Sequence, residues 1–178
     1  MSVLKLIHNP LSDDDLRHIL GEDIKIIKYS QLADYNDLND LLPQRNDCCI
    51  LFYEEQLDVG HWTGLLKYDD KFEHFDSYGI KPDSELRWLT MRARQRLNEA
   101  IPYLSNLLAK VAYIYNTVSF QSDDHTVNTC GSHVAFRLYN FKKNSMHLKQ
   151  YQDYMKELKT ESQMSYDFIV SEWVRKMI

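Results

Sequence analysis

Hydrophobic and polar positions along the chain follow two different periods, and these periods mark out the predicted elements. Residues 48–53 form a continuous apolar run, typical of a strand buried on both faces. The runs at 61–67 and 72–76 are strand-like and flank a polar turn at 68–71, which predicts a β-hairpin. Residues 130–141 carry apolar side chains at helical spacing instead, which predicts a buried helix.

The rest of the chain predicts shorter elements. Ser12 and the three aspartates after it have the form of a capping box, which predicts a helix over 13–20 that stops at Gly21. The other predictions, in chain order, are an extended segment at 24–29, a loop or weak helix at 31–46, a helix from Asp83 or Ser84 to about Ala100, a short helix from Pro102 to about Lys110, a strand at 111–118, a polar loop at 121–129 and two helices within 146–178.

Composition narrows the class of protein. A chain of 178 residues suits one domain, and 44% hydrophobic with 26% charged residues is typical of a soluble globular protein. A net charge of -5 argues against non-specific nucleic-acid binding as the main role. Three cysteines, two of them adjacent, fit a reducing compartment better than a secreted disulfide framework. We also expect no membrane span and no secretory signal, because the apolar run at residues 1–7 is short.

A candidate nucleophile lies where a polar stretch gives way to the predicted buried helix. Cys130 is at this boundary and Gly131 follows it. The N-terminus of a helix carries about half a positive charge and free N–H groups, which can lower the pKa of a thiol. Gly131 allows the backbone to approach a substrate closely. Because an isolated cysteine at a helix start is usually a small packed residue, the interpretation depends on its companions.

The predicted hairpin supplies a base and an acid. Folding about residues 68–71 brings the neighbourhood of His61 beside that of Asp76, so an imidazole and a carboxylate come within reach of each other. His74 competes for the role of base, because it shares a strand face with Asp76. We prefer His61, because it lies on the opposite strand.

A fourth residue completes a chemistry. Gln121 lies nine residues before Cys130, and a side-chain amide can donate a hydrogen bond to an oxyanion. In chain order, His61, Asp76, Gln121 and Cys130 supply a base, its orienting acid, an oxyanion donor and a thiol nucleophile.

Other candidate groups have simpler explanations. Cys48 and Cys49 lie inside an apolar run and fit core packing. His125, Cys130 and His133 have the spacing of a metal set, but the set is incomplete.

Together the four residues resemble those of the adenain-like cysteine proteases, a class that includes the SUMO-specific proteases. The matching segments are Gly60-His61-Trp62, then Phe75-Asp76-Ser77-Tyr78-Gly79-Ile80, then Gln121 followed by Thr129-Cys130-Gly131. The Asp-Ser-Tyr-Gly stretch is similar to that of maturation proteases of virophages and large DNA viruses. The resemblance covers about residues 47–141.

The resemblance implies an α+β fold. A central mixed β-sheet would be flanked by helices in a circular rearrangement of the papain fold, with the nucleophile at a helix N-terminus. It implies one cysteine protease domain over 1–178, with a catalytic core at about 47–141 and a C-terminal helical part at about 146–178. The nine-residue gap between Gln121 and Cys130 exceeds the usual gap in the class, so the loop at 122–128 must bulge.

The resemblance also implies roles for the matched residues. Cys130 would be the nucleophile, His61 the base, Asp76 its orienter and Gln121 the oxyanion donor. Trp62 and Gly131 would contact the substrate, with Trp62 lining a narrow cleft that favours Gly at the cleavage point. No metal or other cofactor is expected.

The implied activity is that of an endopeptidase which cuts viral capsid or other structural precursors after a small residue such as Gly during virion maturation. We expect a monomer that acts in the virion and the host cell interior, either a cytoplasmic virus factory or the nucleus. A deconjugase of ubiquitin-like proteins is one alternative, weakened because no tryptophan precedes Trp62. An inactive protease-like binding module is another.

Nucleic acid enters only as an activator. Adenain is activated by DNA and by a peptide, and neither is required by this sequence. A predicted basic helix could receive DNA, and it carries Arg87, Arg92, Arg94 and Arg96. The alternative is that these arginines form an ordinary solvated face.

Overall fold

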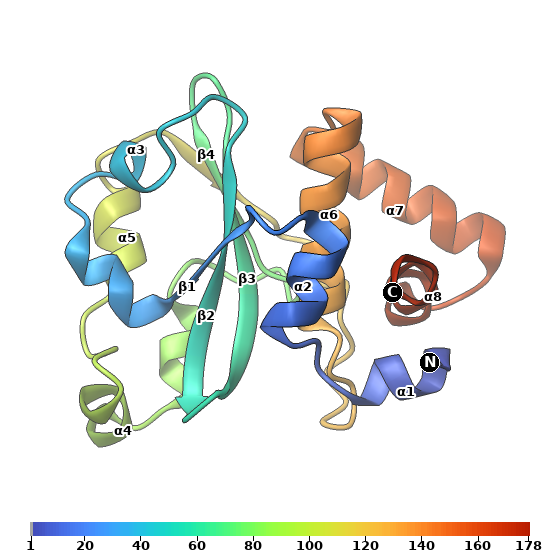
Figure 1. The fold of residues 1–178 in the computed structure, drawn as a ribbon, viewed down its shortest axis with the longest axis horizontal. Coiled ribbons are helices and arrows are strands. Elements are labelled where there is room, and N and C mark those ends of the chain that lie inside the picture. Colours follow the sequence, from blue (N-terminus) through green and yellow to red (C-terminus); the bar gives the residue numbers. More distant parts are fainter. Residues whose placement is uncertain (1) are drawn as a thin grey trace. The chain divides into compact units, whose positions relative to one another are not determined.

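The computed structural model describes residues 2–178 and divides them into two compact units. The first, here called the sheet unit, contains residues 25–76 and 80–116. The second, the helical unit, contains the chain up to Ile24, residues 77–79 and residues 117–178. Helices and a mixed sheet are both present, as the predicted α+β class requires (Figure 1). The arrangement as one protease domain stays a prediction.

The sheet unit is built on five strands in the order β1-β2-β3-β4-β5. Parallel pairs at the two edges, β1 with β2 and β4 with β5, enclose antiparallel pairs in the centre, so the sheet is mixed. The strands are β1 (Lys25–Lys28), β2 (Cys48–Gln56), β3 (Val59–Lys67), β4 (Phe72–Phe75) and β5 (Tyr113–Tyr115).

The predicted hairpin is confirmed. The backbone N–H of Tyr68 donates to the carbonyl of Lys71 across 2.8 Å, which closes the turn between β3 and β4. The last paired residues of this ladder are Gly64 and Phe75. β5 is shorter than the predicted strand at 111–118, because its partner β4 has only four residues with which to pair.

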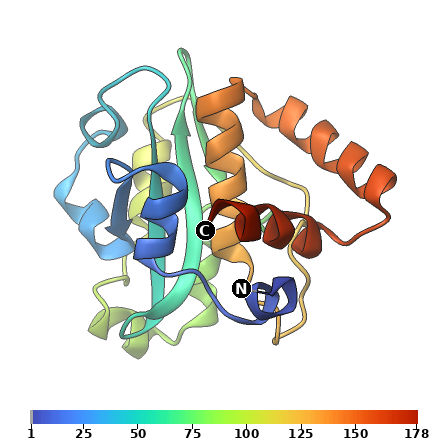
Figure 2. The same cartoon turned by 45° about the vertical axis from the view of Figure 1, so that its right-hand side comes forward.

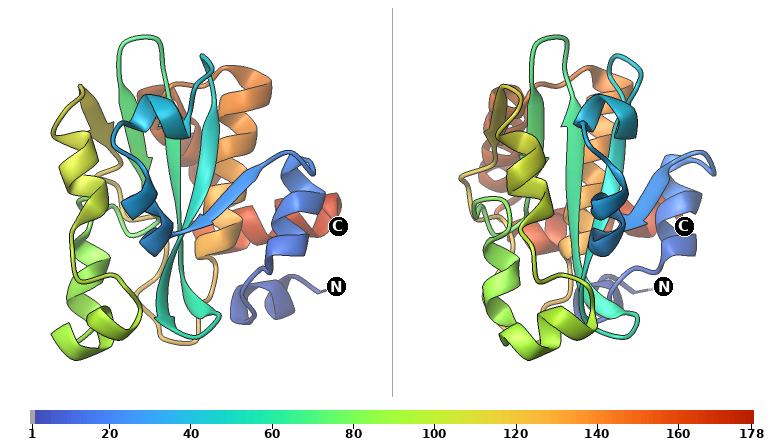
Figure 3. Two further views of the ribbon diagram at one scale, coloured as in Figure 1. Left: turned by 60° about the vertical axis from the view of Figure 1, so that its left-hand side comes forward. Right: turned by 90° about the vertical axis from the view of Figure 1, so that its left-hand side faces the viewer.

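Short helices cover one face of the sheet, and Figure 3 shows α3 and α5 against it. Tyr29 and Tyr53 form the polar centre of this layer, with stacked rings 4.3 Å apart between centroids. Apolar side chains from β2, β3, α3 and α5 fill the space around them, so burial of apolar surface holds this layer together. The helices of the unit are η1 (Tyr29–Asp34), α3 (Leu38–Leu41), η2 (Ser84–Trp88), α4 (Met91–Arg96) and α5 (Tyr103–Leu108).

The prediction of one helix from Asp83 or Ser84 to about Ala100 is wrong. Asp83 adopts a left-handed conformation (φ 66°) and makes no cap hydrogen bond. Its carboxylate instead accepts hydrogen bonds from the hydroxyls of Tyr29 (2.7 Å) and Tyr53 (3.1 Å) and from the backbone of Ser105 (2.7 Å). The chain becomes extended at Leu89 (φ -108°, ψ 147°), so the segment is divided into η2 and α4, and Thr90 caps the second piece. The short helix after Pro102 is confirmed as α5.

The helical unit gathers helices from both ends of the chain. They are α1 (Val3–His8), α2 (Asp13–Leu20), α6 (Cys130–Asn144), α7 (Leu148–Ser162) and α8 (Tyr166–Met177), and Figure 2 shows α8 packed between α1 and α6. The predicted capping box is present, because Ser12 and Asp15 bond reciprocally at the start of α2. The predicted helices at 13–20, at 130–141 and within 146–178 are therefore confirmed. Among the described residues, no helix combines the length and apolarity needed to cross a membrane.

Candidate active site

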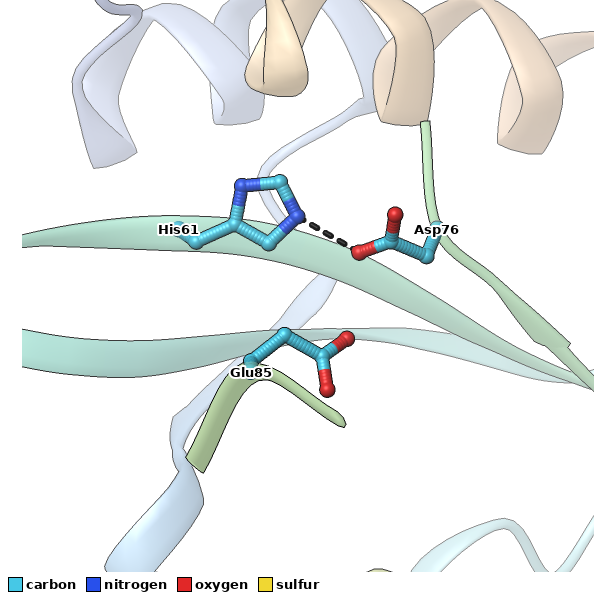
Figure 4. A group of neighbouring side chains, drawn as sticks. All are labelled: His61, Asp76 and Glu85. Atoms are coloured by element: carbon cyan, nitrogen blue, oxygen red, sulfur yellow. Dashed lines mark hydrogen bonds and ion pairs between the residues drawn. The ribbon is translucent and has the colours of Figure 1, made fainter. Parts of the chain in front are cut away.

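The structure brings His61 and Asp76 together within the sheet unit. Nε2 of the imidazole lies 2.6 Å from Oδ2 of the carboxylate (Figure 4). Asp76 follows the Gly64–Phe75 pair by one residue and is therefore level with Thr63, so His61 reaches it diagonally across the hairpin. The contact that we expected from the hairpin is present, with His61 and not His74 as the partner.

Both members of this pair are buried, and the charge resides on the acid. Burial acts to raise the pKa of Asp76, but the charge and hydrogen bond of His61 outweigh it and hold that pKa below its usual range. An ionised Asp76 accepts the hydrogen of Nε2, and this hydrogen bond selects the tautomer. In this tautomer Nδ1 is the ring nitrogen that carries no proton.

Steric crowding explains why the first residue of the Gly60-His61-Trp62 triplet is a glycine. A Cβ built at Gly60 would lie 1.9 Å from the carbonyl oxygen of Tyr53 on the neighbouring strand, so any side chain would push the strands apart. Trp62 is buried and packs on Phe52, with ring centroids 4.3 Å apart. Its role in lining a cleft stays a prediction.

Two residues near His61 were not predicted from the sequence. Trp88 on η2 is 45% exposed, and its ring meets the imidazole edge-on at 5.2 Å between centroids. Glu85, one turn earlier, is buried beside Asp76 (Figure 4). Neither residue belongs to a recognisable motif, so no sequence signal pointed to them.

His61, Asp76 and Glu85 each offer one ligand atom, and these atoms lie within 4.8 Å of one another, a spacing that could hold a metal ion. However, Nε2 of His61 is already bonded to Asp76 at 2.6 Å and carries a proton there rather than a free lone pair. We therefore interpret the three as a set of groups that share protons.

In the helical unit, Cys130 is the first residue of α6, as predicted, and its side chain is buried. The start of this helix is held from α8. Asp167 accepts hydrogen bonds from Thr129 Oγ1 (2.5 Å) and from the backbone N–H of Ser122 (3.1 Å). Its Oδ1 also lies 3.1 Å from Nε2 of His133, one turn into α6.

Asp167 is a further residue that sequence reasoning missed. Burial acts to raise its pKa, but the hydrogen bonds from His133, Thr129 and Ser122 together hold that pKa below the usual range. Since Asp167 engages His133 and since His125 is exposed, the described residues contain no metal group formed by His125, Cys130 and His133.

Gln121 lies in the helical unit with all its amide hydrogens engaged. Oε1 accepts from Ser77 Oγ (2.8 Å), and Nε2 donates to Tyr78 Oη (3.1 Å) and to the carbonyl of Val127 (3.1 Å). The loop at 122–128 contains a turn in which the N–H of Val127 donates to the carbonyl of Asp124, and this places the Val127 carbonyl at the Gln121 amide. An oxyanion role requires one of the two N–H groups to change partner, and it stays a prediction.

The segment directly after Asp76 is bonded to the chain near Gln121. The carbonyl of Ser77 accepts the backbone N–H groups of Phe120 (2.8 Å) and Gln121 (3.0 Å). Gly79 has a positive φ of 71°, and a Cβ there would lie 2.7 Å from the backbone of Val118. Residues 77–79 therefore pack directly against the backbone of residues 117–121, which leads to Gln121.

The predicted site residues are thus divided between the units. His61 and Asp76 are paired in the sheet unit, and Cys130, Gly131 and Gln121 belong to the helical unit. Their joint action is a proposal.

The remaining candidates behave as structural residues. Cys48 and Cys49 are buried on β2, and burial raises the pKa of Cys49, as core packing requires. Arg94 donates to the carbonyls of Glu99 (3.1 Å) and Ala100 (2.7 Å) and so stabilises the end of α4. The other three arginines of the basic segment are exposed on η2 and α4: Arg87, Arg92 and Arg96.

Comparisons with known proteins define a family. The chain is 34% identical over 143 residues to the uncharacterized protein V9 of Sputnik virophage, across 75% of this chain and 81% of that protein. The chain therefore belongs to the family of virophage protein V9. No protein-family model matches it. Among solved structures, it is similar to the ASFV pS273R protease at 15% identity and a TM-score of 0.42, across 75% of this chain and 58% of that protein's length.

Proposed function

We propose that the chain is a cysteine peptidase in which Cys130 is the nucleophile and His61 the general base. The observation that carries the proposal is the 2.6 Å bond between His61 and Asp76, which holds a buried imidazole in one tautomer. The helical start at Cys130 supports it, because thiol nucleophiles commonly use helix N-termini. The order of the motifs along the chain supports it as well.

The chemistry follows from these groups. Nδ1 of His61 takes the thiol proton, and Sγ of Cys130 attacks the scissile carbonyl carbon. Backbone N–H groups at the start of α6, with the amide of Gln121, stabilise the oxyanion. The imidazolium then returns its proton to the leaving amine, and the acyl-enzyme forms. Water attacks the thioester with His61 as base and releases the acid.

The substrate that we propose is a viral capsid or other structural precursor protein, cut after a small residue such as Gly during virion maturation. Virophage membership supports a viral setting. The proposed places of action are the virion and the host cell interior, and the proposed state is a monomer that needs no cofactor. The net charge is -5, so we propose that any contact with DNA uses the exposed arginines of η2 and α4.

The test is peptide cleavage with matched cysteine variants. The protein is incubated with a library of peptides containing Gly, and new termini are identified by mass spectrometry. Cys130→Ala should remove cleavage, whereas Cys48→Ala should retain it, because Cys48 is a packing residue on β2. Full turnover by Cys130→Ala would reject the assignment. Reaction with a ubiquitin or SUMO probe, without peptide cleavage, would favour a deconjugase.

A further inference from the structure

Glu85 is a buried carboxyl that the proposed mechanism does not use. It belongs to η2, is 2% exposed, and neither of its carboxyl oxygens accepts a hydrogen bond from a donor group. One of its oxygens nevertheless lies within 4.8 Å of the facing atoms of both His61 and Asp76 (Figure 4). A buried carboxylate without a partner is costly, so this group must hold a proton or share one.

Two imidazoles lie near Glu85, and neither forms a hydrogen bond with it. The titratable groups that face it are Tyr53 on β2, His61 on β3, His74 on β4 and Asp76 directly after β4. The imidazole of His61 is engaged by Asp76 at 2.6 Å. His74 Nε2 lies 3.9 Å from Glu85, too far for a hydrogen bond, and burial holds the pKa of His74 below its usual range.

We propose that Glu85 stays protonated and donates a hydrogen bond to Asp76, so that the two carboxyls share one proton and Glu85 acts as a positioning residue for the Asp76–His61 pair. This inference rests on the proposed function, since it explains how the orienting acid of the base is itself held. Two adjacent buried carboxyls rarely ionise together, because their charges repel at low dielectric. One proton between them satisfies both groups.

The proton resides on Glu85 rather than on Asp76 for a reason visible in the cluster. Burial and the neighbouring Asp76 carboxylate raise the pKa of Glu85 well above its usual range. Asp76, in contrast, has the imidazole as a direct partner. A second donor fixes the plane of the Asp76 carboxylate and moderates its basicity, which tunes how strongly Asp76 polarises His61.

The first test measures stability against pH without any substrate. Folding raises the pKa of Glu85 above its ordinary value of 4.5, so the contribution of the protonated group is complete below pH 4.5 and is lost as pH rises through the folded value. Glu85→Gln is neutral at every pH and should therefore gain stability relative to the native protein as pH rises. Urea unfolding measures this gain, with Glu157→Gln on the exposed surface of α7 as control. Parallel curves for all three proteins would overturn the inference.

The second test reads the Asp76–His61 bond directly. In protein with ¹⁵N-labelled histidine, the proton on Nε2 of His61 reports the strength of this bond. Glu85→Leu removes the donor, so Asp76 becomes more basic and the resonance should move downfield. Glu85→Gln keeps an amide donor and should stay near the native position. If both variants leave the resonance unchanged, the inference is wrong; if Glu85→Leu does not fold, the pH series with Glu85→Gln decides alone.

Peptide cleavage separates the two proposals. Relative to Glu85→Gln, Glu85→Leu should lower kcat by about tenfold with little change in KM, the effect of losing one hydrogen bond to a charged group. If the resonance and the stability curves change as expected but no peptide is cleaved, the proposed peptidase function is rejected and the shared proton between Glu85 and Asp76 is supported. Cleavage with flat stability curves and equal spectra would reject the role of Glu85 alone.

Discussion

The described residues include two buried aspartate–histidine pairs, one in each unit, and their surroundings differ. In the sheet unit, Asp76 lies 2.6 Å from His61 and has a second buried carboxyl, Glu85, beside it. In the helical unit, Asp167 lies 3.1 Å from His133 and also accepts from a hydroxyl and a backbone N–H. In the sheet unit the pair is the proposed site of proton transfer, whereas in the helical unit the pair holds the start of a helix.

The difference shows what an aspartate must do to serve as an orienter. Asp167 ties three segments together, so its loss should affect folding. Asp76 ends a short strand, and its bond to His61 selects the nitrogen that carries the proton. An imidazole held in one tautomer by a strong acceptor is suited to act as a base, whereas the His133 imidazole takes part in holding a helix start.

The largest effect should separate the two histidines. His61→Gln should lower kcat/KM by about a thousandfold, because a general base contributes that order of rate. His133→Gln should change kcat/KM by less than about tenfold and should lower thermal stability instead, because it loosens α6. Steady-state kinetics and a melting curve for each variant measure this. Equal loss of activity in both variants, with native stability, would contradict the distinction.

A smaller effect should separate the two aspartates. Asp76→Asn should lower kcat by roughly a hundredfold, since the amide can present an N–H to Nε2 and so favour the wrong tautomer. Asp167→Asn should lower kcat far less but lower the free energy of unfolding by about 1–3 kcal/mol. Urea unfolding and kinetics on the same preparations give both numbers. Normal stability of Asp167→Asn would show that Asp167 is no clamp.

The stability effect of Asp167 should also depend on pH. Its folded pKa lies below the ordinary value of 3.8, so its contribution is present above about pH 4 and is lost as pH falls through the folded value. The difference between native protein and Asp167→Asn should therefore shrink on acidification. A difference that stays constant between neutral pH and about pH 3 would contradict this reading of the clamp.

The smallest effect concerns the oxyanion donor. Tyr78→Phe removes one acceptor of the Gln121 amide and leaves the other, Val127, in place. If the amide must release Tyr78 to reach an oxyanion, the variant should raise kcat by about two- to threefold, the effect of a weak hydrogen bond. Gln121→Ala should lower kcat in the same assay. Loss of activity in Tyr78→Phe equal to that in Gln121→Ala would show that Tyr78 positions the amide instead.

Local signals explain which elements the sequence predicts well. The capping box at Ser12, the hairpin turn at 68–71 and the apolar period after Cys130 each depend on residues close in the chain, and all three are confirmed. The hairpin also led from His61 to Asp76. The roles of Gln121 and Cys130, which depend on motif order and spacing, stay predictions.

Distant contacts explain what the sequence does not show. Asp83 bonds to Tyr29, 54 residues earlier, and does not cap the helix that its position had predicted. Asp167 bonds to Thr129 across 38 residues, and Glu85 meets Asp76 only because η2 folds under the strand end. Each is a buried acid whose role depends on tertiary neighbours, and no periodicity or motif encodes such neighbours.

Alkylation of the three cysteines tests the central claim most directly. Iodoacetamide is added to the native protein, and the rate at each cysteine is followed by mass spectrometry, with buried Cys48 and Cys49 as internal references. Cys130 should react fastest. His61→Gln should lower the alkylation rate of Cys130 by at least about tenfold, whereas His133→Gln should leave that rate near the native value. A Cys130 that reacts no faster than the two β2 thiols, or whose rate ignores the loss of the His61 imidazole, would contradict the account.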